Sequence, residues 1–551
     1  MKLSARAQWH PTKLLLTLAL WLTTLGNLPL WLAIWQLPES HGLQVLSTLA
    51  MMAPALLGLT VMALSLMVWP RWLKPAGFLL LLISGFSSYF MHTYGVVIDP
   101  SMMSNALHTD AREVRDLLSW SMVLMLGLGV VLPGAWWWWQ PVRQVSAGKL
   151  IGQQLGCGML GLLVAVLMLW VSFEDLASLM RNHKSLRYLI NPFNTIYAVA
   201  NISVGKAAQA NEPLRPVGED ARFAGPTASP ETSPLIVLVV GETARAANFS
   251  IGGYTRETTP RLKALQDQGD LVYFTDVTSC GTNTQTSVPC MFSHLGRAEF
   301  KSQGGRFENL LDVMSRAGLA VVWLDNQSGC KGVCDRVPHL EVSALQVPAL
   351  CEEGECFDEI MLKKLPEQLA ALDPQRTARA TVVVMHQMGS HGPAYYKRSP
   401  AAHKHFQPEC TSHALQQCET QDIVNAYNNS LRYTDHFLGE TVAWLQSQSR
   451  PTALLYLSDH GESLGEKRLY LHGMPYSIAP TEQTHVPMAL WLSKSMQQAR
   501  GWSIECVRGQ AHKAWSHDNL FHTMLHLSSV TTQVANPGLD ILAQCFTPSG
   551  T

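Results

Sequence analysis

The sequence predicts a chain in two parts: an N-terminal domain of five transmembrane helices and a C-terminal α/β domain with a mostly parallel sheet sandwiched between helices. Three observations support this fold class. The 551 residues are 47% hydrophobic and only 15% charged, and the long apolar runs crowd the first third. Ten of the 11 cysteines lie beyond residue 200. After residue 234, short apolar runs alternate with longer amphipathic patterns, as in α/β folds.

Five uncharged stretches in the first third are each long enough to span a membrane, for which about 20 residues are needed. They cover about residues 14–38, 44–69, 75–98, 117–142 and 150–173. Basic residues flank them on one side: Lys2, Arg6, Lys13, Arg71, Lys74, Arg143 and Lys149. The positive-inside rule therefore predicts a cytoplasmic N-terminus and places everything after residue 173 outside the cytoplasm. A cleaved signal peptide is the alternative for the first stretch. The apolar segment of a signal peptide is only about 7 to 15 residues long, however, and this stretch is longer.

The cysteines independently indicate export, because disulfides persist in oxidising compartments and are rare in the cytosol. Neighbours in the sequence suggest five pairs: Cys280 with Cys290, Cys330 with Cys334, Cys351 with Cys356, Cys410 with Cys418, and Cys506 with Cys545. The sequence alone leaves this connectivity open. A zinc site is the alternative for Cys330 and Cys334, although neither a second close cysteine pair nor a nearby histidine completes it. Cys157, inside the fifth stretch, is expected to be a small buried apolar residue.

Beyond residue 173 the chain divides into a connection and a folded domain. Residues 174–234 are expected to form periplasmic bridging helices and then a linker rich in Ala, Pro and Gly. Residues 235–551 form the predicted α/β domain. Its predicted strands are 235–240, 320–324, 381–385, 452–457 and 486–492, and its helices include 307–317, 357–372 and 422–445. Continuous apolar runs are typical of parallel strands that are buried on both faces.

Polar residues follow three of these strands, at the edge of the sheet where α/β proteins bind ligands. Glu242 follows the first strand, Asp459 and His460 follow the strand at 452–457, and His386 and His391 follow the strand at 381–385. Carboxylate and imidazole ligands without a free thiolate indicate a metal site, with Zn²⁺ as the leading candidate. Glu242 could instead begin a helix, where an acidic side chain favours the helix dipole.

A hydroxyl-rich loop between Cys280 and Cys290 supplies candidate nucleophiles. It contains Thr282, Thr284, Thr286 and Ser287, and chemistry alone does not choose among them. A metal ion lowers the pKa of a hydroxyl that it coordinates and so makes the oxygen nucleophilic near neutral pH. A loop of this composition is otherwise typical of helix capping.

Five short motifs occur in order, at residues 241–245, 278–284, 287–291, 458–463 and 471–475. With these motifs the chain resembles the lipid A phosphoethanolamine transferases over nearly its whole length. The resemblance implies five transmembrane helices and a periplasmic, zinc-dependent domain of the alkaline phosphatase and sulfatase type. It implies that Thr284 is the nucleophile and that Glu242, Thr284, Asp459 and His460 bind one zinc ion. Lys331, His391 and His472 match substrate-side residues, and the two histidines match the place where the family can hold a second metal.

The resemblance also gives lipid-facing roles to Asn105, Thr109 and Glu113, which lie in the loop between the third and fourth apolar stretches. Their spacing of four residues predicts that all three lie on one face of a helix. Without the resemblance, the same pattern describes an ordinary amphipathic surface helix.

The implied reaction moves phosphoethanolamine from phosphatidylethanolamine to a phosphate of lipid A, through a phosphoethanolamine-threonine intermediate, and releases diacylglycerol. An added primary amine lowers the negative charge of the membrane surface, which accounts for the family's link to resistance against polymyxin and other cationic peptides. The expected location is the bacterial inner membrane, with the catalytic domain in the periplasm and no protein partner. The formal net charge of -1 gives no electrostatic support for nucleic-acid binding.

Several other functions compete with this interpretation. A transferase that modifies core sugar, or one that transfers phosphoglycerol, would keep the same metal and threonine. A membrane-anchored phosphohydrolase would use water as the second nucleophile. A sensor or receptor needs no intact metal set, and a transporter would need charged or broken spans, whereas the five stretches contain no Asp, Glu, Lys or Arg.

Overall fold

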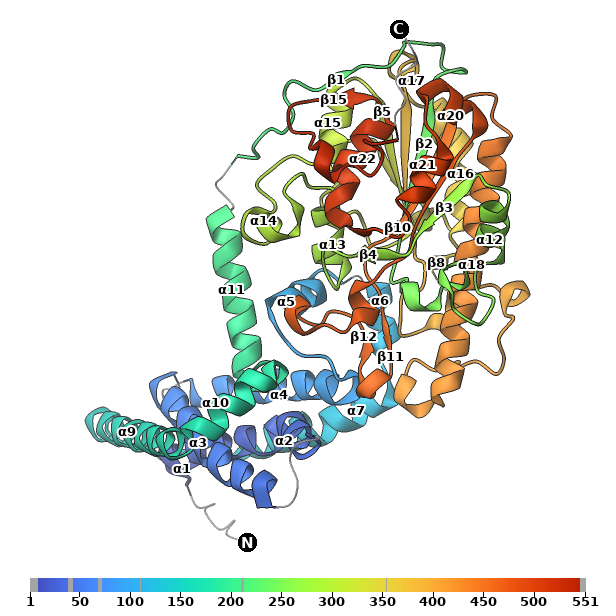
Figure 1. Ribbon diagram of the computed structural model, residues 1–551. Helices are drawn as coiled ribbons and strands as arrows, with labels where there is room; N and C mark the ends of the chain where they lie inside the picture. The colour runs from blue at the N-terminus through green and yellow to red at the C-terminus, as the bar shows by residue number, and fades with distance from the viewer. Residues whose placement is uncertain are drawn as a thin grey trace. The chain divides into compact units, whose positions relative to one another are not determined.

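The chain folds into two units, described here from a computed structural model (Figure 1). The structure describes residues 8–37, 43–67, 72–109, 111–209, 213–352 and 354–545, so Lys2, Arg6 and Arg71 lie outside the described residues. The helical unit comprises residues 1–103 and 118–203. The sheet unit comprises residues 104–117 and 204–551. A short segment between two apolar helices therefore belongs, by its contacts, to the sheet unit.

Five helices of the helical unit are long and apolar enough to cross a membrane, within the part of the chain that is described. They run over Pro11–Trp35, Val45–Leu66, Leu73–Tyr94, Trp120–Trp139 and Ala147–Val171. The first is α1 (Pro11–Thr23) and α2 (Leu28–Trp35) joined by a 3-10 turn, the second lies in α3 (Leu43–Met67), and the third is α4 (Leu73–Tyr94). The fourth is α7 (Trp120–Leu126) and α8 (Leu132–Trp139) joined by a π-helical turn, and the fifth is α9 (Ala147–Val171). The five predicted helices are present, with ends that differ by a few residues.

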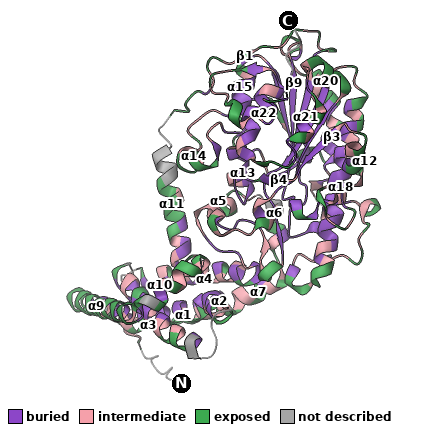
Figure 2. Ribbon diagram, in the orientation of Figure 1, coloured by how far each residue is buried: buried purple, intermediate pink, exposed green. Residues whose placement is uncertain are grey.

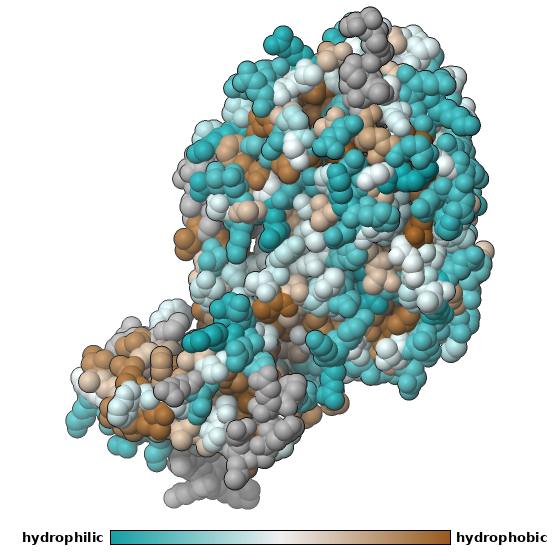
Figure 3. Space-filling model, in the orientation of Figure 1, coloured by the Kyte–Doolittle hydropathy of each residue, from teal (hydrophilic) through white to brown (hydrophobic). Residues whose placement is uncertain are grey.

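The surface of the helical unit suits a lipid environment. Met159, Leu163 and Trp170 on α9 are 73%, 63% and 77% exposed, and Figure 3 shows hydrophobic side chains across this part of the chain. Within the described residues of the five apolar helices, the charged side chains are those of Lys13, Lys74 and Lys149, each in the first turn of its helix. Lys74, in the first turn of α4, donates from Nζ to the carbonyl oxygen of Trp138 at 2.7 Å. Large apolar side chains facing outward and lysines near helix ends are features of membrane-spanning helices.

The first part of the predicted bridging segment, up to residue 209, is helical, with α10 (Phe173–Asn182) and α11 (Phe193–Gln209) flanking a 3-10 helix. Buried Asn191 anchors this segment inside the helical unit. Its Nδ2 donates to the carbonyl oxygens of Gly26 and Ser84 at 2.9 and 2.8 Å, and its backbone N–H donates to Asn27 Oδ1 at 2.9 Å. These bonds pair polar groups that would be costly to bury alone in an apolar environment.

The sheet unit is built on seven strands in the order β3-β13-β10-β2-β9-β5-β6. They are β3 (Leu271–Phe274), β13 (Met488–Leu492), β10 (Thr452–Ser458), β2 (Leu235–Gly241), β9 (Thr381–His386), β5 (Ala320–Asp325) and β6 (His339–Glu341). The last five in spatial order are parallel, and β13 runs antiparallel to both β10 and β3. This arrangement confirms the predicted mostly parallel sheet. The predicted strand at 486–492 is the antiparallel member.

Helices cover both faces of this sheet, and six of its seven strands are buried, whereas the edge strand β6 is largely exposed (Figure 2). The side chains of β2 alternate between two hydrophobic cores, as expected for successive residues of a strand. Ile236, Leu238 and Val240 pack into the core with α13 (Thr284–Met291), α15 (Leu310–Arg316) and α22 (Leu520–Leu527). Leu235, Val237 and Val239 pack into the core with α12 (Pro260–Asp267), α16 (Glu359–Ala370) and α18 (Thr420–Gln446). The predicted α/β fold with helices on both faces is confirmed.

Ten cysteines of the sheet unit form five disulfides, in the same five pairs that their positions in the sequence suggest. The bonds are Cys280–Cys290, Cys330–Cys334, Cys351–Cys356, Cys410–Cys418 and Cys506–Cys545. The zinc alternative for Cys330 and Cys334 therefore does not apply. Cys157 is free and lies on α9, where it is partly rather than fully buried.

Candidate active site

The candidate site lies at the carboxyl ends of three adjacent parallel strands. β2 leads into Glu242, and β10, its neighbour on one side, leads into Asp459 and His460. β9, its neighbour on the other side, ends at His386. Because these strands are parallel and adjacent, their ends meet at the same edge of the sheet. Thr284 joins them from the first turn of α13, where Asn283 caps the helix by accepting a hydrogen bond from the N–H of Thr286.

Four side chains converge at this edge. Thr284 Oγ1 lies 3.3 and 3.2 Å from Glu242 Oε1 and Oε2 and 3.3 Å from His460 Nε2. His460 Nε2 is 3.3 Å from Asp459 Oδ2. One ligand atom from each of Glu242, Asp459 and His460 lies within 4.8 Å of the others, and all three side chains are fully buried. The four residues that the sequence proposes as metal ligands are therefore together in space.

The electrostatics of this cluster suit a cation. Burial, assisted by repulsion from Asp459, raises the pKa of Glu242 to about 8, and burial raises the pKa of Asp459 to about 6. Asp459 Oδ2 is buried without a hydrogen-bond partner among the described residues. His460 Nδ1 lies 2.9 Å from the carbonyl oxygen of Gly461, which can only accept. Nδ1 therefore carries the proton and Nε2 presents its lone pair to the cluster. Two repelling carboxylates, an unpaired oxygen and a free lone pair fit a divalent metal ion.

The four hydroxyls between Cys280 and Cys290 differ in their surroundings. Thr282 Oγ1 donates to the carbonyl oxygen of Met474 at 2.6 Å, and Ser287 Oγ donates to the carbonyl oxygen of Asp459 at 2.5 Å. Thr284 instead faces the carboxylates and the imidazole. The structure therefore distinguishes Thr284 among hydroxyls that sequence chemistry leaves equivalent.

Two further histidines lie beside the cluster. The rings of His460 and His472 are 4.3 Å apart and those of His391 and His472 are 5.8 Å apart, centre to centre. His472 Nδ1 lies 3.5 Å from Glu462 Oε2, and His391 Nε2 lies 3.8 Å from Glu113 Oε1. Burial lowers the pKa of His472 to about 4 and, together with the positive field of neighbouring groups, lowers the pKa of His391. Both imidazoles are therefore neutral near pH 7.

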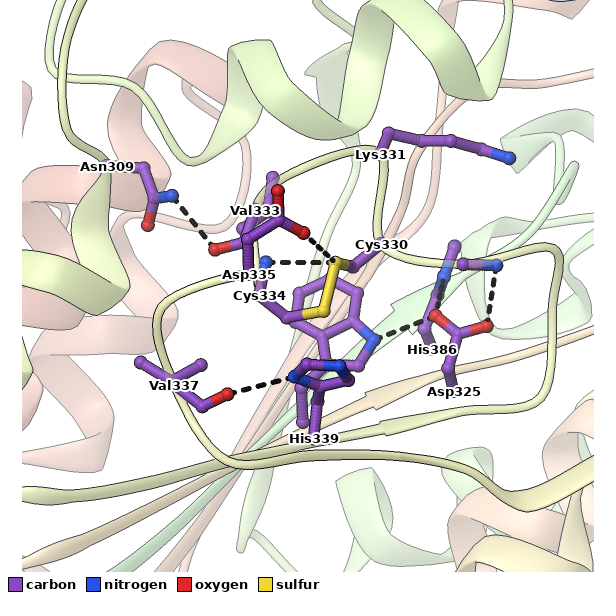
Figure 4. The surroundings of a disulfide bond; sticks show 12 residues. Asn309, Asp325, Cys330, Lys331, Val333, Cys334, Asp335, Val337, His339 and His386 are labelled. Carbon is purple, nitrogen blue, oxygen red and sulfur yellow. Dashed lines mark hydrogen bonds and ion pairs between the residues drawn. A yellow bond between two sulfur atoms is a disulfide. The ribbon is translucent and has the colours of Figure 1, made fainter. Parts of the chain in front are cut away.

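Lys331 lies on the loop closed by the Cys330–Cys334 disulfide, and Figure 4 shows its side chain extending away from the sulfur atoms. Its backbone is left-handed, with φ of 52°. Its Nζ donates to the carbonyl oxygen and the Oγ of Ser328 at 2.9 and 2.7 Å. The charge of Lys331 is one of those that lower the pKa of His391, so the ammonium group acts on the same region.

The segment with Asn105, Thr109 and Glu113 departs from the prediction. The three residues do not share one helix, because α5 (Pro100–Leu107) ends before Thr109 and α6 (Ala111–Leu117) carries Glu113. Thr109 Oγ1 donates to the carbonyl oxygen of Asn105 at 2.9 Å, and the His108 ring contacts the carbonyl oxygen of Ser104. Side chains thus compete for carbonyls that a continuing helix would use, which favours a break. Glu113 reaches Gln327 Nε2 at 3.2 Å as well as His391.

Two supporting groups were not anticipated from the sequence. Asp325, at the end of β5, lies 3.0 Å from His386 Nδ1 and also accepts from Trp323 Nε1 at 2.8 Å (Figure 4). His386 Nε2 is then 3.9 Å from Glu242 Oε2. Thr243 contacts both Glu242 and Asp459. In the sequence, Asp325 is recognisable only as an acidic residue at the end of a strand. Its contact with His386 can be predicted only when β5 is known to lie next to β9.

Comparison with known proteins agrees with this geometry. The Sulfatase family model matches residues 234–530, and the model described as phosphoethanolamine transferase EptA/EptB matches residues 56–207. The chain is 40% identical over 492 residues to phosphoethanolamine transferase EptA of Salmonella typhimurium, covering 88% of each chain. It is 37% identical over 544 residues to phosphatidylethanolamine transferase Mcr-1 of Escherichia coli, covering 96% of each.

A solved structure extends the similarity to nearly the whole chain. The integral membrane protein lipooligosaccharide phosphoethanolamine transferase A (EptA) of Neisseria meningitidis matches with a TM-score of 0.93 and 35% identity, covering 97% of this chain and 99% of that chain. A sulfatase-type domain with a buried candidate metal site, in one chain with five helices long and apolar enough to cross a membrane, defines a membrane-bound enzyme of the sulfatase fold. Within that class, the chain belongs to the phosphoethanolamine transferase family of the EptA and Mcr type.

Proposed function

We propose that the enzyme transfers phosphoethanolamine from phosphatidylethanolamine to a phosphate group of lipid A, with Thr284 as the group that carries it between the two lipids. The observation that carries this proposal is the position of Thr284. Its Oγ1 lies within 3.3 Å of the Glu242 carboxylate and of His460 Nε2, in a buried cluster suited to a metal ion. Related proteins named phosphoethanolamine transferases support the group transferred.

The reaction divides into two displacements at phosphorus. In the first, Thr284 Oγ forms a bond to the phosphorus of phosphatidylethanolamine, and the bond from phosphorus to the diacylglycerol oxygen breaks. The hydroxyl proton passes through a neutral imidazole to that oxygen, so that diacylglycerol leaves as an alcohol. In the second, a lipid A phosphate oxygen attacks the same phosphorus and the bond to Thr284 breaks. The proton of the attacking lipid A phosphate group passes through the imidazole to the threonine oxygen, and the enzyme is restored.

Glu242, Thr284, Asp459 and His460 would hold a zinc ion, because two carboxylates, a hydroxyl and an imidazole match its ligand preferences. When bound, the ion would lower the pKa of the threonine hydroxyl and offset negative charge on the phosphoryl oxygens. His391 and His472 match the place where the family can hold a second metal, as the resemblance implies. While no second ion is bound there, they are the neutral imidazoles available for proton transfer.

The remaining predicted residues would act on the substrate. Lys331 would place positive charge near the phosphoryl oxygens, where charge develops during transfer. Glu113, 3.8 Å from His391 Nε2, would face the ammonium group of the ethanolamine from the segment that also carries Asn105 and Thr109. Opposite charges on Lys331 and Glu113 suit the zwitterionic head group of the donor lipid.

The membrane helices would hold the enzyme on the surface where both lipids reside. The distribution of basic residues supports a cytoplasmic N-terminus and a periplasmic sheet unit in the inner membrane of a bacterium. The five disulfides support the same oxidising compartment. A positively charged amine on lipid A would weaken the binding of polymyxin and similar cationic peptides.

Mass spectrometry of lipid A and core oligosaccharide tests the proposal in a Gram-negative host. Cells would express the wild type, Thr284→Ala or the matched control Thr286→Ala, which removes a hydroxyl two residues away in the same helix. We expect phosphoethanolamine on lipid A with the wild type and the control but not with Thr284→Ala. Modified core sugar would show a different acceptor, and modification by Thr284→Ala equal to the wild type would exclude Thr284 as the nucleophile. Release of free phosphoethanolamine without an acceptor would favour a hydrolase.

A further inference from the structure

Thr243 has a backbone conformation that threonine rarely adopts. Its φ is 61°, in the left-handed region, although the residue is β-branched and follows directly after Glu242. In this region the side chain of an L-residue crowds the backbone, and a β-branched residue there is a genuine outlier. The side chain is also fully buried. Such a conformation persists only where surrounding contacts fix it, and such residues cluster at functional sites.

Three hydrogen bonds fix Thr243 in this conformation. Its backbone N–H donates to Asp459 Oδ1 at 3.1 Å, and its Oγ1 donates to Glu242 Oε1 at 2.5 Å. Its carbonyl oxygen accepts from the Tyr427 hydroxyl at 2.8 Å. The same Tyr427 oxygen accepts from the backbone N–H of Arg245 at 2.9 Å, so one hydroxyl holds both ends of the turn.

These bonds fix one oxygen of each of the two carboxylates. The N–H groups of Thr243 and His460 both donate to Asp459 Oδ1, at 3.1 and 2.7 Å. Asp459 Oδ2 is left buried and without a partner among the described residues. On Glu242, Oε1 accepts the bond from Thr243 while both oxygens stay at the cluster, 3.3 and 3.2 Å from Thr284 Oγ1. Thr243 therefore fixes one oxygen of each acid and so sets the orientation of both carboxylates at the cluster.

We infer that Thr243 is a positioning residue that orients Glu242 and Asp459 to bind a metal ion. Glycine adopts the same backbone conformation at little cost, so conformation alone favours glycine at this position. The threonine side chain adds the bond to Glu242, which glycine cannot make. The inference rests on the metal site proposed above, and it adds a residue that touches neither the ion nor the lipid.

Four forms of the full-length protein in detergent micelles test the inference: the wild type, Thr243→Ser, Thr243→Val and Thr243→Gly. Thr243→Val keeps the branched shape and the strain but lacks the hydroxyl, and Thr243→Ser keeps the hydroxyl. Each protein would be stripped of metal with a chelator. Zinc affinity would then be measured by competition with a fluorescent zinc chelator, and the metal-free melting temperature would be measured in parallel.

We expect Thr243→Val and Thr243→Gly to bind zinc about 10- to 100-fold more weakly than the wild type, and Thr243→Ser to stay within about threefold. Metal-free Thr243→Gly should melt at or above the wild-type temperature, because glycine relieves the strain. If Thr243→Val binds zinc as tightly as a zinc-binding wild type, the inference fails while the metal proposal stands. A purely structural role would lower the melting temperature of Thr243→Gly and leave zinc affinity unchanged. A wild type that binds no zinc at the cluster would overturn both proposals.

Discussion

Replacing Glu242 by glutamine should stabilise the metal-free protein while removing its ability to hold a metal. Glu242 is fully buried next to Asp459, and burial first, then repulsion from that neighbour, raises its pKa to about 8 from an ordinary value of 4.5. A carboxyl group with a raised pKa in the folded state contributes its full stability below the unfolded pKa. That contribution falls as the pH rises from the unfolded pKa to the folded pKa. Glutamine resembles the protonated acid in shape and does not ionise, so the stability of Glu242→Gln does not fall with pH in this way.

The size of the effect follows from this pKa. At pH 7 the protein lies about 2.5 pH units above the ordinary value, and each unit corresponds to about 1.4 kcal/mol. The wild type has therefore lost about 3 kcal/mol relative to its fully protonated state. For a domain of somewhat over 300 residues, this difference corresponds to about 5 °C in melting temperature.

Thermal unfolding of the full-length protein in detergent micelles, with metal removed by a chelator, measures this difference. Glu242→Gln should melt about 5 °C above the wild type at pH 7, and the gap should narrow toward pH 5. Glu359→Gln is the matched control, for which the melting temperature at pH 7 should fall instead of rise. The hydrogen bond from His436 lowers the pKa of Glu359, so its stabilisation is present at pH 7 and lost only as the pH falls through that lowered pKa.

Added zinc completes the experiment. Zinc should raise the melting temperature of the wild type and of Glu359→Gln but not that of Glu242→Gln, because binding to the folded state alone stabilises it. A Glu242→Gln protein that melts below the wild type without metal at pH 7 would refute the reasoning. It would mean that Glu242 is a structural acid, whose contacts outweigh the cost of its burial.

Two further substitutions test the loop that supports the site. Asp358→Asn should lower the free energy of unfolding by about 4 kcal/mol. The new amide would face two buried donors, the Gln387 side chain and the N–H of Gly389, and would leave them unpaired. Denaturant titration measures this loss, and an unchanged unfolding midpoint would contradict it. Gly389→Ala should reduce transfer activity about 10-fold or more, because its new Cβ would lie 2.7 Å from the backbone oxygen of Glu242 at a φ of 52°. Mass spectrometry of modified lipid A measures the transfer rate. A rate close to that of the wild type would show that the loop around residue 389 moves to accommodate the new Cβ and that Glu242 keeps its position.

The central cluster can be predicted from the sequence because parallel strands bring their carboxyl ends to one edge of the sheet. Glu242 and the Asp459–His460 pair each follow a buried apolar run, so the fold class places them at the same edge of the sheet, and the pairing of β2 with β10 brings them together. The choice of Thr284 among four hydroxyls depends on where each oxygen points. That direction is set by the cap at Asn283 and by partners far away in the sequence, such as Met474.

Other features depend on information that a sequence pattern does not carry. Asp325 supports His386 only because β5 is next to β9, and strand order is not sequence order. The spacing of Asn105, Thr109 and Glu113 fits a helix, yet local side-chain bonds to backbone carbonyls accompany a break in that helix. The left-handed backbone of Thr243 results from contacts with Asp459 and Tyr427 across the sheet edge.

The assignment of residues 104–117 to the sheet unit has a practical consequence for dissecting the enzyme. A soluble fragment that starts at residue 204 would lack α6 and its acidic residues. Asp116, in that helix, lies 3.2 Å from both Lys397 and Arg398, and Arg398 is buried and donates to the carbonyl oxygen of His391 at 2.8 Å. The fragment would retain the cluster around Thr284 but lose Glu113 and one of the acids that pair with Arg398. Chemistry measured on such a fragment would test the proposed role of Thr284 but would miss the proposed contribution of Glu113 to lipid binding.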